Sequence, residues 1–130
     1  MIRTASCCCG GLKAHCEGEP ARVSVCHCLE CQKRTGSAFG VQARFAQEQV
    51  RVEGPSGRFE RVGDEGTRAA FQFCQSCGTT VLWRNEEMPG LVAVAVGAFA
   101  DPSFPAPKRT VYEDRAHPWV ELHGIEERWD

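Results

Sequence analysis

The sequence lacks any apolar segment long enough to cross a membrane as a helix. Its longest uninterrupted apolar run is Leu91–Val96, whereas a membrane-spanning helix needs about 20 apolar residues. The run predicts a short buried strand. The first residues, Met1–Cys7, contain no apolar signal-peptide region, so we expect a cytoplasmic protein without membrane contact.

The chain also lacks a surplus of positive charge. Its 15 Lys and Arg residues face 17 Asp and Glu residues, which gives a formal net charge of −2 at pH 7. Nucleic-acid-binding domains normally present a basic face, so we do not expect a nucleic acid as the partner. With 130 residues, 42% hydrophobic and 25% charged, the composition is that of an ordinary globular protein with one core.

No stretch shows the sustained 3.6-residue apolar period of a long amphipathic helix, and no repeat or linker divides the chain. Short segments rich in β-branched and aromatic residues recur instead, so we predict one mainly β domain over residues 1–130. The predicted strands span residues 23–26, 39–45, 49–53, 57–62, 69–73, 81–83 and 91–96. Short helical turns are predicted around Leu29–Arg34 and Ala46–Gln49.

The most unusual feature of the composition is its nine cysteines. An odd number leaves one cysteine outside any disulfide scheme, and a reducing compartment keeps thiols free. The spacings of the familiar ferredoxins are absent, and no βαβ setting supports a thioredoxin-like pair. The cysteines fall into three clusters, Cys7–Cys9, Cys26–Cys31 and Cys74–Cys77, with Cys16 apart. This grouping favours metal binding.

Two of the clusters can complete one closed metal site. Cys74 and Cys77 form a C-x-x-C pair followed by glycine, which is typical of a zinc-binding turn. Residues i and i+2 of an extended strand share a face, so Cys7 and Cys9 are expected to point together while Cys8 faces away. These four cysteines predict a tetrahedral structural zinc site.

The remaining cluster offers three ligands, Cys26, Cys28 and Cys31. Three protein ligands and an exchangeable fourth position are the usual arrangement of catalytic zinc. We expect Cys26 and Cys28 on one strand face and Cys31 after a turn, with His27 pointing the other way. His27 then either orients a group or relays a proton, or it is a packed histidine.

The fourth position of this site can be filled in more than one way. Glu30, Cys16 or Cys8 can complete it, and both metals are then purely structural. If the position is open, three cysteinates that cancel the charge of the metal favour a soft thiol over hydrolytic water. Lys33 and Arg34 are candidate docking groups for a carboxylate, and Ser37 is a candidate hydrogen-bond donor; the alternative for all three is a solvated turn.

The run from Cys26 to Phe39, C-H-C-L-E-C-Q-K-R-T-G-S-A-F, resembles the signature of the glutathione-dependent formaldehyde-activating enzyme family, which includes centromere-protein-V-like proteins. Four further motifs occur in the order of that family and extend the resemblance over residues 6–119. They are C-x-C-G at residues 7–10, F-C-x-x-C-G-T at 73–79, V-A-V-G-A-F at 94–99 and Y-E-D-R-A-H-P-W at 112–119.

The resemblance implies a β-tent fold of small antiparallel sheets organised around two zinc ions. It also implies that the four cysteines Cys7, Cys9, Cys74 and Cys77 hold a structural zinc and that Cys26, Cys28 and Cys31 hold a catalytic one. The activity of the family is condensation of glutathione with formaldehyde to S-hydroxymethylglutathione, a carbon–sulfur lyase reaction read in reverse. Two further readings are a thiol-binding carrier without turnover and a zinc-stabilised partner-binding module.

Overall fold

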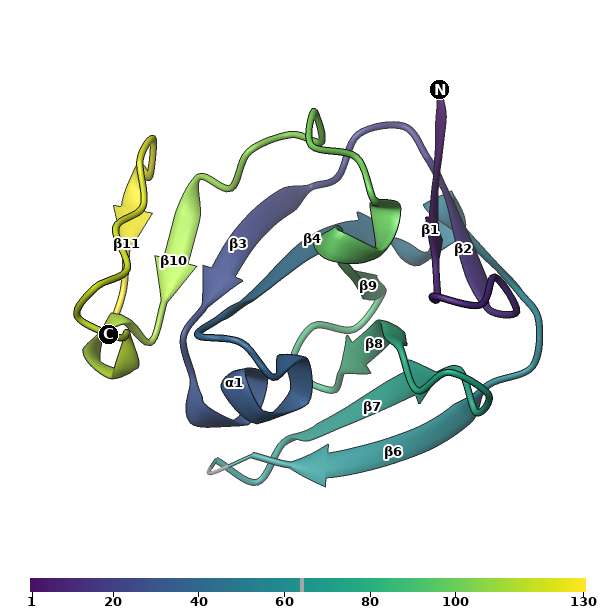
Figure 1. Cartoon of the computed structure of the whole chain (residues 1–130), viewed down its shortest axis with the longest axis horizontal. Helices are drawn as coiled ribbons and strands as arrows, with labels where there is room; N and C mark the ends of the chain where they lie inside the picture. The colour runs from purple at the N-terminus through teal and green to yellow at the C-terminus, as the bar shows by residue number, and fades with distance from the viewer. Residues whose placement is uncertain (64) are drawn as a thin grey trace.

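Most of the chain forms β-strands in two sheets, which confirms the prediction of a mainly β fold (Figure 1). The computed structural model describes residues 1–63 and 65–130. The smaller sheet has the order β1-β2-β5 and is antiparallel, and the larger has the order β11-β10-β3-β4-β9-β8-β7-β6. The strands are β1 (Ile2–Ser6), β2 (Lys13–Glu17), β3 (Arg22–Cys26), β4 (Gly40–Ala46), β5 (Val50–Glu53), β6 (Gly57–Val62), β7 (Arg68–Phe73), β8 (Thr80–Asn85), β9 (Leu91–Ala95), β10 (Arg109–Val111) and β11 (Glu127–Arg128).

The larger sheet is antiparallel from β3 to β6 and parallel around β10. Strand β10 runs parallel to β3 on one side and to β11 on the other. Parallel neighbours need a long connection, and β3 and β10 are separated by most of the chain. This edge therefore adds parallel pairs to a fold whose other strand pairs are antiparallel.

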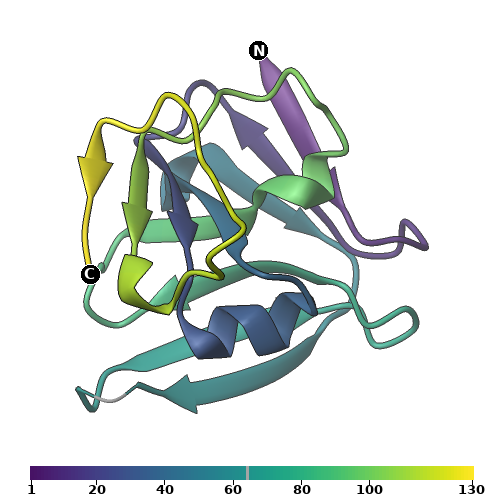
Figure 2. The same cartoon turned by 60° about the vertical axis from the view of Figure 1, so that its left-hand side comes forward.

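The helical segments are short. They are α1 (Leu29–Thr35) and three 3₁₀ turns, η1 (Gln47–Gln49), η2 (Val96–Phe99) and η3 (Glu113–Arg115). The turns predicted around Leu29–Arg34 and Ala46–Gln49 are thus confirmed. No helix among the described residues has the length and apolar character needed to span a membrane. Helix α1 lies on the face of the larger sheet that is turned away from the smaller sheet (Figures 1 and 2).

Successive residues of the central strands point to opposite faces of the larger sheet and so build two apolar clusters. Leu82 and Val94 are cross-strand partners that are fully buried in the main core, where they join residues of the smaller sheet. Burial of one such side chain stabilises the fold by roughly 1.5–3 kcal/mol. Their neighbours Trp83 and Ala93 face the other way and form a smaller cluster with Phe71, on the side of α1, whose Arg34 lies over the Trp83 ring.

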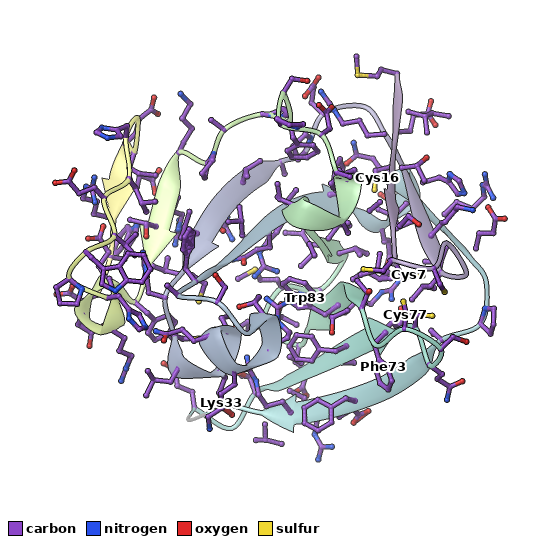
Figure 3. All side chains as sticks on the ribbon, viewed as in Figure 1. Cys7, Cys16, Lys33, Phe73, Cys77 and Trp83 are labelled. Carbon is purple, nitrogen blue, oxygen red and sulfur yellow. The ribbon has the colours of Figure 1, made fainter. Side chains whose placement is uncertain are left out.

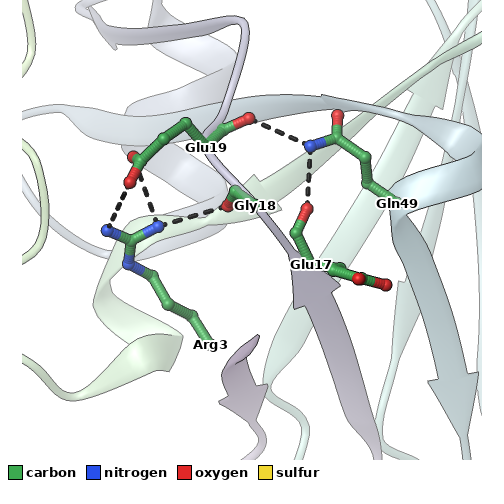
Figure 4. Close-up of polar contacts among 5 residues, drawn as sticks. All are labelled: Arg3, Glu17, Gly18, Glu19 and Gln49. Atoms are coloured by element: carbon green, nitrogen blue, oxygen red, sulfur yellow. Dashed lines mark hydrogen bonds and ion pairs between the residues drawn. The ribbon is translucent and has the colours of Figure 1, made fainter. Parts of the chain in front are cut away.

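Polar contacts fix the loop that follows β2 (Figure 4). Gln49 donates from Nε2 to the carbonyl oxygens of Glu17 at 2.8 Å and Glu19 at 3.0 Å. Arg3 donates to the carbonyl oxygen of Gly18 at 3.3 Å and to the carboxylate of Glu19. Because these residues belong to β1, the β2 loop and η1, the contacts hold the edges of the smaller sheet in register.

Candidate metal centres

The structure brings Cys7, Cys9, Cys74 and Cys77 together, and all four sulfur atoms lie within 4.8 Å of one another. The Sγ atom of Cys9 is 3.7 Å from that of Cys7 and 3.5 Å from that of Cys74. Four sulfurs placed tetrahedrally about 2.3 Å from zinc would be about 3.8 Å apart. The donor atoms and their spacing therefore fit zinc. Figure 3 shows Cys7 and Cys77 meeting from two different parts of the chain.

This quartet is formed by two turns of similar design. In each turn the backbone N–H of the first cysteine donates to the carbonyl oxygen five residues on, from Cys7 to Leu12 and from Cys74 to Thr79, both at 2.9 Å. A glycine with positive φ follows each cysteine pair. These glycines are Gly10, with φ of 83°, and Gly78, with φ of 82°. A left-handed residue lets the chain reverse directly after the second sulfur.

The expectation that Cys7 and Cys9 share a face of an extended strand is wrong. Strand β1 ends at Ser6, and Cys8 and Cys9 lie in the turn of the β1–β2 hairpin. The turn itself, rather than strand alternation, brings the two outer sulfurs together. Cys8 is exposed and lies outside the quartet, and its backbone N–H donates to Oγ1 of Thr79 at 3.2 Å.

Hydrogen-bond donors surround the sulfurs of the quartet. The N–H of Leu12 donates to Sγ of Cys7 at 3.2 Å, and Oγ1 of Thr79 lies 3.3 Å from Sγ of Cys77. The Thr79 hydroxyl, helped by the backbone N–H groups of Thr79 and Cys9, lowers the pKa of Cys77 to about 5. Metal binding requires thiolates, so these donors favour the ligating form of the sulfur.

The second group, Cys26, Cys28 and Cys31, also has its three sulfurs within 4.8 Å of one another. Cys26 is the last residue of β3, Cys28 is the N-cap of α1 and Cys31 lies in the helix, so the expected common strand face of Cys26 and Cys28 is wrong. The N–H of Cys31 donates to Sγ of Cys28 at 3.3 Å. The start of the helix thus positions this triad.

Contacts within the triad favour a thiolate at its most exposed member. Hydrogen bonds from Cys26 and then Cys31 lower the pKa of Cys28 to about 2, with smaller contributions that include the charge of Arg61. In Cys26 the pKa is raised instead, mainly by its hydrogen bond with Cys28 and next by its hydrogen bond with Cys31. Cys26 and Cys31 are buried, whereas Cys28 is partly exposed. Three cysteine sulfurs suit a soft divalent metal such as zinc.

None of the candidate fourth ligands is brought to the triad. Cys16 is fully buried in β2, where its Sγ contacts the carbonyl oxygen of Ala14 at 3.8 Å and where burial raises its pKa to about 11. Cys8 lies in the β1–β2 turn, where its N–H donates to Thr79, and Glu30 forms an ion pair of 3.1 Å with Lys33. Among the described residues, no other Cys, His, Asp or Glu donor lies with the three sulfurs at the distance that defines the group.

His27 is a packed residue beside the triad. Its side chain is buried, its ring centroid lies 5.8 Å from that of Phe39, and its backbone N–H donates to the carbonyl of Val111. Burial lowers the pKa of His27, which favours the neutral imidazole near pH 7. Its Nδ1 atom is buried and makes no hydrogen bond with a described residue.

Gln32 ties the triad's helix to the C-terminal segment. Its Nε2 donates to the carbonyl oxygens of His27 at 2.8 Å and Arg115 at 3.1 Å. Its Oε1 lies 2.8 Å from Nε2 of His117. The C-terminal family motif thus packs against the start of α1, a contact that the sequence pattern did not reveal.

A pocket of about 400 Å³ adjoins α1. Of the three predicted docking residues, Lys33 and Arg34 line it, whereas Ser37 lies in the exposed turn after the helix and does not. Its lining residues are Glu30, Lys33, Arg34, Phe59, Arg61, Phe71, Phe73 and Thr80. Arg61 was not predicted, because it comes from β6 and carries no motif near it in the sequence.

Comparisons with known proteins agree with this architecture. The model of the family described as glutathione-dependent formaldehyde-activating enzyme matches residues 2–115. The fold is similar to the crystal structure of a Rhodobacter sphaeroides protein, with a TM-score of 0.58, 18% sequence identity, and coverage of 98% of this chain and 99% of that one. No curated protein matches the sequence. The chain belongs to the glutathione-dependent formaldehyde-activating enzyme family.

Proposed function

We propose that residues 1–130 form one zinc-binding domain that joins glutathione to formaldehyde, giving S-hydroxymethylglutathione, or catalyses a closely related thiol–carbonyl reaction. The observation that carries this proposal is the triad of Cys26, Cys28 and Cys31, which gathers three sulfurs without a fourth described donor beside a pocket. The quartet, by contrast, offers a complete tetrahedral set and is assigned the structural zinc.

The triad suits a thiol substrate. A zinc ion held there would favour the thiolate form of an incoming thiol, and its three cysteinate ligands make it a poor activator of water. In the reaction the thiolate sulfur attacks the carbonyl carbon, a carbon–sulfur bond forms, and the carbonyl oxygen takes up the proton lost by the thiol. No atom or electron pair is left over, so the reaction needs no redox partner.

Cations near the triad can dock the carboxylates of glutathione. Arg34 is the stronger candidate, because it lines the pocket and makes no ion pair with the described residues. Lys33 lines the same pocket but pairs with Glu30 at 3.1 Å, and both side chains are largely exposed, so its contribution is smaller. A docked carboxylate would orient the thiol toward the triad.

The proposal is tested by measuring adduct formation from glutathione and formaldehyde with the zinc-loaded protein, after subtraction of the spontaneous reaction. We expect an excess rate that Cys28→Ser abolishes. Cys8→Ser is the matched control, because this thiol lies outside both cysteine groups, and it should retain the rate. An excess rate that is absent, or that survives Cys28→Ser, would disprove the enzymatic proposal.

A thiol-binding carrier is the second candidate, and one observation favours it. The histidine nearest the triad, His27, is buried with a lowered pKa, so it is a poor proton donor for turnover. Calorimetric binding of glutathione that requires Cys28 but accelerates no reaction would support the carrier. A partner-binding module, in contrast, predicts no glutathione binding that depends on the triad.

A further inference from the structure

The pocket beside α1 holds two arginines that no carboxylate among the described residues pairs with. It is lined by Lys33, Arg34 and Arg61, and by one carboxylate, Glu30, which is taken up by Lys33. Within residues 1–63 and 65–130, neither arginine forms an ion pair. Two guanidinium groups in one pocket therefore remain available to an anion.

Aromatic rings hold both guanidinium groups in place. The Cζ atom of Arg34 lies 4.3 Å from the ring centroid of Trp83 and 5.7 Å from that of Phe71, and Cζ of Arg61 lies 5.4 Å from the same Phe71 ring. A guanidinium over a ring is held by its face, which leaves its N–H donors for an acceptor. Nε and Nη2 of Arg34 are buried and have no hydrogen-bond partner among the described residues.

Two like charges beside one ring repel each other, and an anion between them would remove that repulsion. A carboxylate is the best match, since its two oxygens accept a pair of parallel N–H bonds from a guanidinium. The charge of the pocket thus selects an anion with planar, bidentate geometry.

The rest of the lining is apolar and aromatic. Phe59, Phe71 and Phe73 come from the β6–β7 hairpin, and the ring centroids of Phe59 and Phe71 are 6.5 Å apart. Phe59 is 58% exposed, so its ring is open to a ligand. A flat apolar group can cover these rings while its carboxylate meets the arginines. A volume of about 400 Å³ suits a small molecule.

The pocket also adjoins the triad through Gly40. A Cβ added at Gly40 would lie 2.9 Å from Nη2 of Arg34 and 3.6 Å from Cβ of Cys31. The guanidinium of Arg34 and the side chain of Cys31 therefore approach the same point on β4. A ligand held by Arg34 has its anionic end next to a ligand residue of the metal site.

We propose that this pocket binds a carboxylate attached to a flat apolar group, with Arg34 and Arg61 as the anion-binding residues and the three phenylalanines as the apolar surface. A substrate that carries such a group would be selected by this pocket and presented to the triad. This last step rests on the proposed function, whereas binding itself does not.

Binding is tested with benzoate by calorimetry or NMR titration of the zinc-loaded protein. Acetate supplies the charge without the ring, and benzyl alcohol supplies the ring without the charge. We expect benzoate to bind about tenfold or more tightly than either, because charge and ring contribute together. Equal binding of benzoate and benzyl alcohol, or no binding of benzoate, would disprove the proposal.

Substitutions distinguish benzoate binding in this pocket from general attraction to surface charge. Arg61→Gln and Arg34→Gln should each weaken benzoate binding about tenfold or more, the loss expected for a charge-assisted hydrogen bond. Arg84→Gln is the matched control, because Arg84 is exposed and lines a different pocket, so benzoate binding should be unchanged. Unaltered binding in both pocket variants, or an equal loss in the control, would contradict the assignment.

Gly40→Ala tests the link to the triad. The added methyl group meets only the flexible end of Arg34 at close range, so the fold and the metal content should persist while benzoate binding weakens. Tight benzoate binding in this variant would show that Arg34 does not act from its observed position. If benzoate binds as expected but no glutathione–formaldehyde adduct forms, the binding pocket is supported and the proposed reaction is disproved.

Discussion

The two cysteine groups differ in how far apart their members are in the sequence. The quartet joins the β1–β2 turn to the β7–β8 turn, and Cys9 and Cys74, whose sulfurs are 3.5 Å apart, are separated by 65 positions. The triad lies within the single connection from β3 to α1. A metal at the quartet therefore closes a long loop between two sheets, whereas a metal at the triad binds a segment that its own hydrogen bonds already shape.

The two cysteine groups also differ in exposure, and here the triad is the more buried of the two. Cys9 and Cys77 of the quartet are exposed, while two of the three triad cysteines are buried. A complete set of four sulfurs needs no cover to hold its metal. An exchangeable position, as proposed for the triad, would need walls that select what reaches it, and the pocket between α1 and the β6–β7 hairpin could supply them.

The largest expected effect is the loss of folding in Cys74→Ser. A structural zinc contributes roughly 10–16 kcal/mol of apparent binding free energy, which is comparable to the total stability of a domain, about 5–15 kcal/mol. We expect circular dichroism to show loss of the native spectrum or a steep fall in melting temperature, as a strong chelator should also produce. A native melting temperature in Cys74→Ser would show that the quartet is no more necessary for folding than the triad.

Cys28→Ser should destabilise the fold less than Cys74→Ser does, but it should abolish metal binding at the triad. Serine is a good N-cap residue and can accept the N–H of Cys31 as the sulfur does. We therefore expect a native spectrum with half the zinc of the wild type, measured by elemental analysis. Cys16→Ala should keep the full metal content, since Cys16 belongs to neither group; unfolding of Cys28→Ser would contradict the comparison.

The turn of the quartet can be probed without touching a sulfur. Gly78 has a φ of 82°, so Gly78→Ala should destabilise the fold by roughly 1–2 kcal/mol, the cost of a left-handed non-glycine residue. The matched control is Gly97→Ala, because an added Cβ there meets nothing within 4 Å and no positive φ is required. Equal free energies of unfolding in urea for the two variants would show that the turn carries no such constraint.

The smallest effect concerns the smaller sheet, which carries the first cysteine turn. Nε2 of His15 lies 2.7 Å from Oε1 of Glu53, and this hydrogen bond lowers the pKa of the carboxyl group. A lowered carboxyl pKa stabilises the fold above the unfolded value and loses that contribution as pH falls through the folded one. Glu53→Gln should lower the melting temperature slightly at about pH 6 and not at about pH 3. If the melting temperature of Glu53→Gln were still lowered in acid, the effect would come from packing and not from the ionised carboxylate.

The sequence allowed the larger part of the candidate centres to be predicted, because cysteine spacing reports directly on ligand chemistry. Both groups form from the predicted residues, although the reasoning for Cys7 and Cys9 failed. Alternation within a strand and a tight turn both bring residues i and i+2 together. Spacing alone does not distinguish them, and the hairpin register that decides between them depends on β2.

Contacts between distant segments explain most of what was missed. Strands β1, β2, β10 and β11 were not predicted. All four are short, and β2 and β11 contain no β-branched or aromatic residue. Their pairing with neighbours stabilises them more than their own propensity does. Arg61 joins the pocket only because β6 pairs with β7 beside α1, and no pattern near Arg61 in the sequence indicates that partner.

The thiol ligands and the aromatic pocket surface come from different parts of the chain, which bears on how such proteins diversify. The thiol ligands come from the β3–α1 connection and the two turns, whereas the aromatic surface comes from the β6–β7 hairpin at the edge of the sheet. If the pocket binds substrate as proposed, substitutions in that hairpin would alter which molecule is accepted while every candidate metal ligand is retained. Descendants of one ancestral chain can therefore acquire new substrate ranges around an inherited metal centre.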